Sequence, residues 1–158
     1  MLCYNGIMKK TPNSPLRRGW TTGACATAAV RVCLEQLWGS HHIAKIQITL
    51  PRGEQPSFAI AHRDSGEDWV EIGITKDAGD DPDVTHGALI IARVSEGGSG
   101  VTFYAGEGVG YITKAGLPIK VGEPAINPIP RQMMEAQVIE LSKSYKKNPN
   151  IKITISIP

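Results

Sequence analysis

The chain has 158 residues, of which 41% are hydrophobic and 20% are charged, a composition typical of a single globular domain that buries roughly 70% of its unfolded surface. The net charge of +2 does not support nucleic-acid binding, and no apolar run is long enough to span a membrane. Three cysteines without metal-ligand spacing argue against a disulfide framework or a zinc site, so we expect a cytoplasmic protein without nucleic-acid or membrane partners.

The first elements predicted in chain order are an arm and a helix. Residues 1–18 are rich in proline, asparagine and lysine, and we expect a flexible N-terminal arm there. A helix follows, because Thr22 can cap it and apolar residues then recur with the period of one buried helical face until Gly39 ends it. Residues 19–158 are predicted to form one domain.

Alternating apolar and polar residues predict strands through the middle of the chain and at its end. These strands are expected at 45–50, 58–60, 70–74, 89–94, 101–104, 109–113 and 151–157. A second helix is predicted over 132–145, after a proline-rich connector at 118–130. Two helices with mostly non-parallel strands predict an α+β fold in two layers, a mixed or antiparallel sheet packed against two main helices.

The final predicted strand carries four isoleucines at alternate positions, and the sequence stops directly after it. An exposed strand of this composition promotes aggregation. We therefore expect further protein to cover it, either a second domain, a partner chain or another copy in a homo-oligomer.

The segment 76–87 holds four carboxylates, one lysine and one histidine, and it fits the ligand spacing of a calcium loop in neither sensible register. Two interpretations are equally open. The segment is either a hydrated turn or a site where one crowded carboxylate stays protonated and acts as an acid beside His86. A looser divalent-metal site is a weaker alternative, made of Asp81, Asp83 and His86. The candidate catalytic residues are Asp77, Asp80, Asp81, Asp83 and His86.

The start of the first helix is a candidate anion site. Thr21, Thr22 and Gly23 place hydroxyl and backbone N–H groups at the positive end of the helix. Arg17 and Arg18 come just before them. Simple helix capping is the alternative, and it explains Thr22 without explaining its two neighbours.

Two later segments are also open to a functional or a structural interpretation. Gly106, Gly108 and Gly110 either bend the backbone or let it approach a flat ligand, and no helix follows them as a nucleotide-binding motif would need. The stiff segment 122–131 contains three prolines. It either presents Glu123, Asn127 and Arg131 to a ligand or is an ordinary connector.

Four blocks, taken in this order, resemble the cobalt-precorrin-5B C1-methyltransferase (CbiD) family of anaerobic cobalamin biosynthesis. The blocks are 17–26, 76–87, 106–110 with 113–117, and 122–131. The resemblance implies methyl transfer from S-adenosylmethionine to C1 of cobalt-precorrin-5B, giving cobalt-precorrin-6A. It also implies that residues 19–158 match the N-terminal domain of the family, with a second domain, and much of the S-adenosylmethionine site, absent from this chain.

The implied substrate is a tetrapyrrole with many carboxylates, which cationic side chains and N–H groups would bind. The candidate binding residues are Arg17, Arg18, Thr21, Thr22, Gly23, Lys76, Gly106, Gly108, Gly110, Lys114 and Arg131. No resident metal ion is expected. Two alternatives stay open: a non-catalytic corrinoid-binding or assembly module and, with little support, a divalent-metal hydrolase built on the acidic segment.

Overall fold

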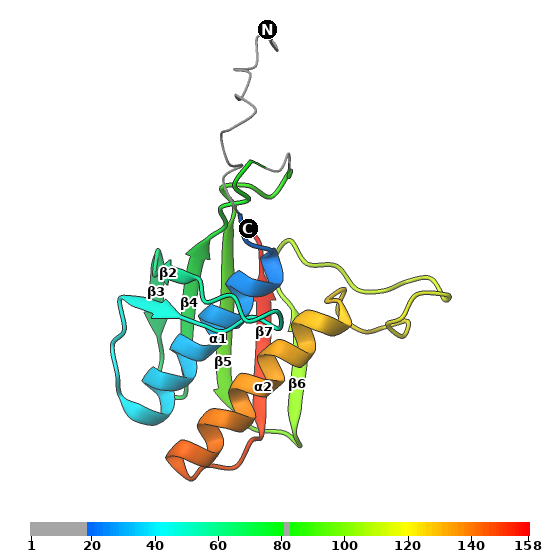
Figure 1. Ribbon diagram of the computed structural model, residues 1–158. Coiled ribbons are helices and arrows are strands. Elements are labelled where there is room, and N and C mark those ends of the chain that lie inside the picture. The colour runs from blue at the N-terminus through cyan, green and yellow to red at the C-terminus, as the bar shows by residue number, and fades with distance from the viewer. Residues whose placement is uncertain (1–18, 81–82) are drawn as a thin grey trace, which may run out of the picture.

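The computed structural model describes residues 19–80 and 83–158. Two helices, α1 (Thr22–Gly39) and α2 (Pro128–Tyr145), lie on one face of a five-stranded sheet (Figure 1). The sheet contains β3 (His62–Ser65), β4 (Trp69–Thr75), β5 (Leu89–Glu96), β6 (Val101–Ala105) and β7 (Ile151–Ser156). Two short strands, β1 (Lys45–Gln47) and β2 (Ser57–Ala59), form a separate antiparallel pair. The predicted two-layer α+β fold is confirmed.

The strand order β3-β4-β5-β7-β6 places β7 inside the sheet. On one side Ile153 of β7 lies opposite Val94 of antiparallel β5, and on the other it lies opposite Phe103 of parallel β6. The prediction of an exposed C-terminal strand is therefore wrong, because β5 and β6 already pair with both of its edges. The expectation that a partner chain or a homo-oligomer covers this strand loses its basis with it.

The core lies between the helices and the sheet. Ile72, Ile90 and Ile153 point from the sheet toward the helices and are fully buried. Most residues of α1 from 23 to 34 are buried too, so this helix is enclosed on nearly all sides rather than on the one face that its sequence pattern predicts. The cause is that α1 packs against both the sheet and α2, and a helix that is apolar around its circumference is typical of such a central position.

The elements differ from the prediction at several places, since no strand was predicted over 62–65, where β3 lies, and β1 ends at Gln47 instead of residue 50. Thr21, not Thr22, caps α1. α2 begins at Pro128, inside the predicted connector, because proline fits the first turn of a helix, where its missing N–H has no partner to lose. No strand forms over 109–113, where a single bridge joins Tyr111 to Pro124. Within the described residues, no helix is long and apolar enough to cross a membrane.

Candidate functional site

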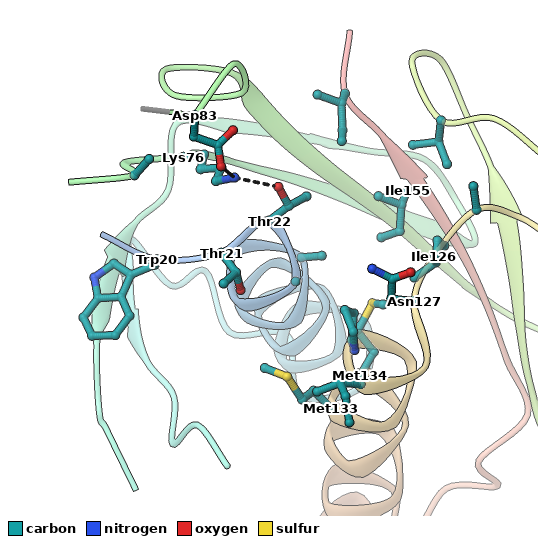
Figure 2. A pocket seen from close by; sticks show the side chains of 18 of the residues that line it. Trp20, Thr21, Thr22, Lys76, Asp83, Ile126, Asn127, Met133, Met134 and Ile155 are labelled. Carbon is teal, nitrogen blue, oxygen red and sulfur yellow. Dashed lines mark hydrogen bonds and ion pairs between the residues drawn. The ribbon is translucent and has the colours of Figure 1, made fainter. Parts of the chain in front are cut away.

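A pocket of about 600 Å³ lies between the N-terminal ends of α1 and α2 and the carboxyl end of β7 (Figure 2). Most of its wall is apolar, and the larger apolar side chains are Trp20, Val109, Ile126, Met133, Met134, Ile155 and Ile157. Its polar side chains are Thr21, Thr22, Lys76, Asp83 and Asn127. A concave apolar cavity with a few polar groups is the usual form of a small-molecule site.

The α1 end of the pocket is built by the helix cap. Thr21 Oγ1 accepts a hydrogen bond from the Ala24 N–H at 3.0 Å. The N–H groups of Thr22 and Gly23 occupy the first two helical positions, where no intrahelical acceptor exists. Gly23 also lets the two helices approach, since a Cβ there would lie 2.7 Å from Pro130 Cγ. The predicted binding residues Thr21, Thr22 and Gly23 thus lie together at the pocket wall.

Lys76 connects α1 to the acidic loop, which is the segment 76–87 described above. Its side chain is only 5% exposed, and its Nζ donates to Thr22 Oγ1 at 3.0 Å and to Asp83 Oδ2 at 2.8 Å (Figure 2). The same Nζ donates to Thr85 Oγ1 at 2.6 Å. These three bonds use all the protons of the ammonium group. Lys76 therefore lies at the pocket, as the prediction of a binding residue requires, but its charge is directed at protein oxygens.

Asp83 is held as a carboxylate. Its Oδ2 accepts from Lys76, and its Oδ1 accepts from the Thr85 N–H at 2.8 Å and from Thr85 Oγ1 at 2.6 Å. The hydrogen bond from Lys76, followed by those from Thr85, holds the pKa of Asp83 well below its usual range. Asp83 is thus ionised near neutral pH and does not fit the protonated acid that the crowding of carboxylates suggests.

The rest of the acidic loop is tied into a turn. His86 Nδ1 accepts the Ala78 N–H at 2.9 Å and lies 3.8 Å from Asp77 Oδ1, which accepts the Gly79 N–H at 2.8 Å. Neither His86 nor Asp77 is among the residues that line the pocket. Asp80 is exposed. The candidates Arg17, Arg18 and Asp81 lie outside the described residues.

The acidic loop is also fastened to the chain before α1. The Trp20 N–H donates to the Asp77 carbonyl at 2.8 Å, and a Cβ on Gly19 would lie 1.8 Å from the carbonyl carbon of Ala78. Only glycine allows so close an approach. In the described part of the chain, no group of three His, Cys, Asp or Glu side chains is arranged to hold a metal ion.

The three glycines of the turn after β6 differ in their surroundings. A Cβ on Gly106 would lie 2.1 Å from Ser156 Oγ, and one on Gly108, which has a φ of 78°, would lie 1.9 Å from the Ile157 carbonyl oxygen. These two glycines therefore let the turn pack against the end of β7. A Cβ on Gly110 would meet nothing within 4 Å, so this is the glycine whose backbone has open space beside it.

Arg131 and Lys114 are not at the pocket wall. Arg131 Nε donates to the Ile126 carbonyl at 2.8 Å and Nη2 to the Pro124 carbonyl at 2.7 Å, which fastens the connector to α2. Lys114 is exposed on the long loop between β6 and α2 (Figure 1). The structure thus separates both cations from the cluster at the α1 end.

The list of candidate binding residues drawn from the sequence omitted several pocket residues, although Asn127 was named as a residue that the segment 122–131 could present. Asn127 occupies the N-cap position of α2, yet its side chain makes no capping hydrogen bond and lines the pocket instead. A helix start at Pro128 would have indicated it. No sequence signal marks the apolar pocket residues Met133, Met134, Ile155 and Ile157. Apolar residues of a predicted helix or strand are assigned to the hydrophobic core by their pattern.

Comparisons with known proteins point to one family. The model of the CbiD family matches residues 9–158. The cobalt-precorrin-5B C(1)-methyltransferase of Rhodospirillum rubrum is 61% identical over 121 residues, which cover 75% of this chain and 34% of that protein. The enzyme of the same name from Paramagnetospirillum magneticum is 50% identical over 145 residues, covering 90% of this chain and 41% of the relative.

A solved structure has the same fold. The cobalamin biosynthesis protein CbiD from Archaeoglobus fulgidus superposes with a TM-score of 0.63 at 26% identity, covering 89% of this chain and 44% of that chain. The chain therefore spans less than half the length of these relatives. Because the family model matches nearly the whole chain, this protein belongs to the CbiD family.

Proposed function

We propose that this chain supplies the corrinoid-binding part of an enzyme that methylates C1 of cobalt-precorrin-5B with S-adenosylmethionine, giving cobalt-precorrin-6A. One observation carries the proposal. The four blocks that carry the family resemblance are far apart in the sequence, yet each contributes to the same pocket, through Thr22, Lys76, Val109 and Asn127 among others. A fold needs no such convergence for its stability, whereas a ligand site does.

The pocket suits one edge of a flat, carboxylate-rich macrocycle. Its apolar wall removes water from the ring, and the N–H groups at the start of α1 favour an anionic side chain. Gly110 follows the pocket residue Val109 and has open space beside it, where the backbone would approach a ring that extends beyond the pocket. We propose that most of the S-adenosylmethionine site lies in the part of the relatives that this chain does not cover. We propose that this part is the second domain of the family.

Methyl transfer requires mainly that the nucleophilic carbon and the methyl donor be held in the right positions. An electron pair of the corrinoid carbon forms the new C–C bond, the C–S bond breaks with its electron pair on sulfur, and S-adenosylhomocysteine leaves. The corrinoid then loses one proton. We keep Asp77, Asp80, Asp81, Asp83 and His86 as the candidate acceptors of that proton. Asp83 lines the pocket and is ionised, but the lowered pKa that keeps it ionised also makes it a weak base.

A second candidate function is corrinoid binding without catalysis. It is favoured by the bonding of the acidic loop, since both Asp83 oxygens and His86 Nδ1 already accept hydrogen bonds from the protein. In this case the chain would hold or deliver a corrinoid and transfer no methyl group.

Binding is measured on the purified chain. Titration with cobalt-precorrin-5B, followed by visible absorbance, is expected to show saturable binding, whereas calorimetric titration with S-adenosylmethionine alone is expected to show little. The absence of corrinoid binding would overturn both functions.

Methylation is measured in a chimera, because the proposed S-adenosylmethionine site lies mostly outside this chain. The matching part of the full-length Rhodospirillum rubrum relative is replaced by this chain, and the product formed from both compounds is analysed by mass spectrometry. Methylation by the chimera supports the first function, whereas corrinoid binding without methylation favours the second.

A further inference from the structure

We propose that Lys76 is a positioning residue that makes the Thr22 hydroxyl a hydrogen-bond donor for a carboxylate of the ligand. The proposal rests on the proposed function and deepens it, because it names the chemical group received at the polar end of the pocket. In this proposal Lys76 orients the Thr22 hydroxyl and does not bind the substrate directly, although its charge alone would suggest direct binding.

The direction of each hydrogen bond in the cluster follows from the ammonium group. Lysine has three protons and no acceptor, so the Thr22 and Thr85 oxygens must both accept from Nζ. The Thr85 hydroxyl donates a hydrogen bond to Asp83 Oδ1 at 2.6 Å. For the Thr22 hydroxyl proton, the described residues supply no acceptor within hydrogen-bonding distance. Thr22 is therefore left as a donor.

The position of Thr22 decides where that donor can act. Thr22 lines the pocket at the start of α1, whereas Thr85 does not line it (Figure 2). The ammonium that orients Thr22 is 5% exposed and bonded three times, so it cannot swing out to bind the ligand itself.

The Thr22 hydroxyl offers its proton to an acceptor, and the negative charge of nearby Asp83 is balanced by its ion pair with Lys76. A carboxylate forms a stronger hydrogen bond with a hydroxyl than a neutral amide does. Two ligands of the proposed reaction offer this group: the peripheral side chains of the corrinoid and the amino-acid portion of S-adenosylmethionine. The chemistry at Thr22 is the same in both cases, and separate titrations distinguish the two sources.

The test compares Thr22→Val, Thr22→Ser and Thr85→Val in the full chain. Valine keeps the shape of threonine without its hydroxyl, and Thr85→Val is the matched control because it removes a bond to the same ammonium outside the pocket wall. Each variant is titrated with a cobalt corrinoid whose side chains are free acids, with the same corrinoid amidated, and with S-adenosylmethionine. Melting temperatures are recorded for all.

We expect Thr22→Val to weaken binding of the free-acid corrinoid about tenfold or more and to reduce the preference for acid over amide. Thr22→Ser should restore both, and Thr85→Val should lower only the melting temperature. Lys76→Met, if it folds, should lose the same acid preference as Thr22→Val. If instead the loss appears only with S-adenosylmethionine, the carboxylate comes from the methyl donor.

Two results would overturn the proposal in distinguishable ways. Corrinoid binding that is unchanged in Thr22→Val, or weakened equally in Thr85→Val, rejects the role of Lys76 and Thr22 while the proposed function stands. A wild-type chain that binds neither ligand rejects both.

Discussion

At the scale of single residues, the charge of Asp83 links the pocket to the stability of the fold. Because Lys76 and Thr85 lower the pKa of Asp83 in the folded chain, the stabilisation is present at neutral pH and is lost as the pH falls below the unfolded-state pKa of about 3.9. Asp83→Asn should lower the melting temperature by several degrees at pH 7. The difference from wild type should shrink between about pH 4 and pH 3.

Urea denaturation at pH 7, 5 and 3 measures this dependence. Asp68→Asn is the control, since Asp68 is exposed and forms no ion pair in the part of the chain that the structure describes. A difference between wild type and Asp83→Asn that stays constant down to pH 3 would show that Lys76 does not stabilise the Asp83 carboxylate.

Two neighbouring glycines provide a matched test of the turn after β6. Gly108→Ala forces a side chain into left-handed backbone, which costs about 1–2 kcal/mol, and directs its Cβ at the Ile157 carbonyl. Gly110→Ala meets open space and should leave the stability nearly unchanged while weakening corrinoid binding. Thermal unfolding and absorbance titration of both variants check this, and equal melting temperatures would contradict the packing role of Gly108.

Sequence reasoning placed the threonines and glycine at the start of α1 and Lys76 among the candidate binding residues. The structure brings them together at one pocket, and their binding role stays a prediction. Arg131 was also predicted to bind a ligand, but it lies away from this pocket, and its guanidinium donates hydrogen bonds to two carbonyl groups of the connector. Only the folded path of the connector brings those carbonyl groups into reach.

At the scale of elements, the position of β7 inside the sheet predicts that truncating one of its buried side chains lowers the free energy of unfolding substantially. Ile153 is fully buried in the core and pairs with Val94 of β5 and Phe103 of β6, so Ile153→Ala should cost about 2–5 kcal/mol. Ile139 of α2 is 46% exposed, and Ile139→Ala should cost less than about 1 kcal/mol. Chemical denaturation measures both, and similar losses would contradict the central placement of β7.

Alternation and helical period predicted most elements, because both depend on neighbours in the sequence. The order of the strands depends instead on contacts between distant residues, and β7 pairs with β6 although the long loop and α2 separate them. Alternating isoleucines describe a strand with a buried face and give no information about which strands lie beside it. The expectation of an exposed edge failed for this reason.

At the scale of the whole molecule, the central claim is that four separate blocks form one ligand pocket. The sequence allowed the blocks to be grouped by resemblance, but their meeting point depends on the sheet, which brings the acidic loop, the turn after β6 and the end of β7 to the same edge (Figure 1). Asn127 and Met133 join the pocket from α2.

Heteronuclear NMR of the labelled chain during titration with cobalt-precorrin-5B, in its diamagnetic state, tests this claim most directly. The amide signals of Thr22, Gly23, Asn127 and Met133, which come from two different blocks and α2, should shift together with one dissociation constant. Shifts confined to the opposite face of the sheet, around Arg93 and Lys152, would contradict the assignment of the pocket as the corrinoid site.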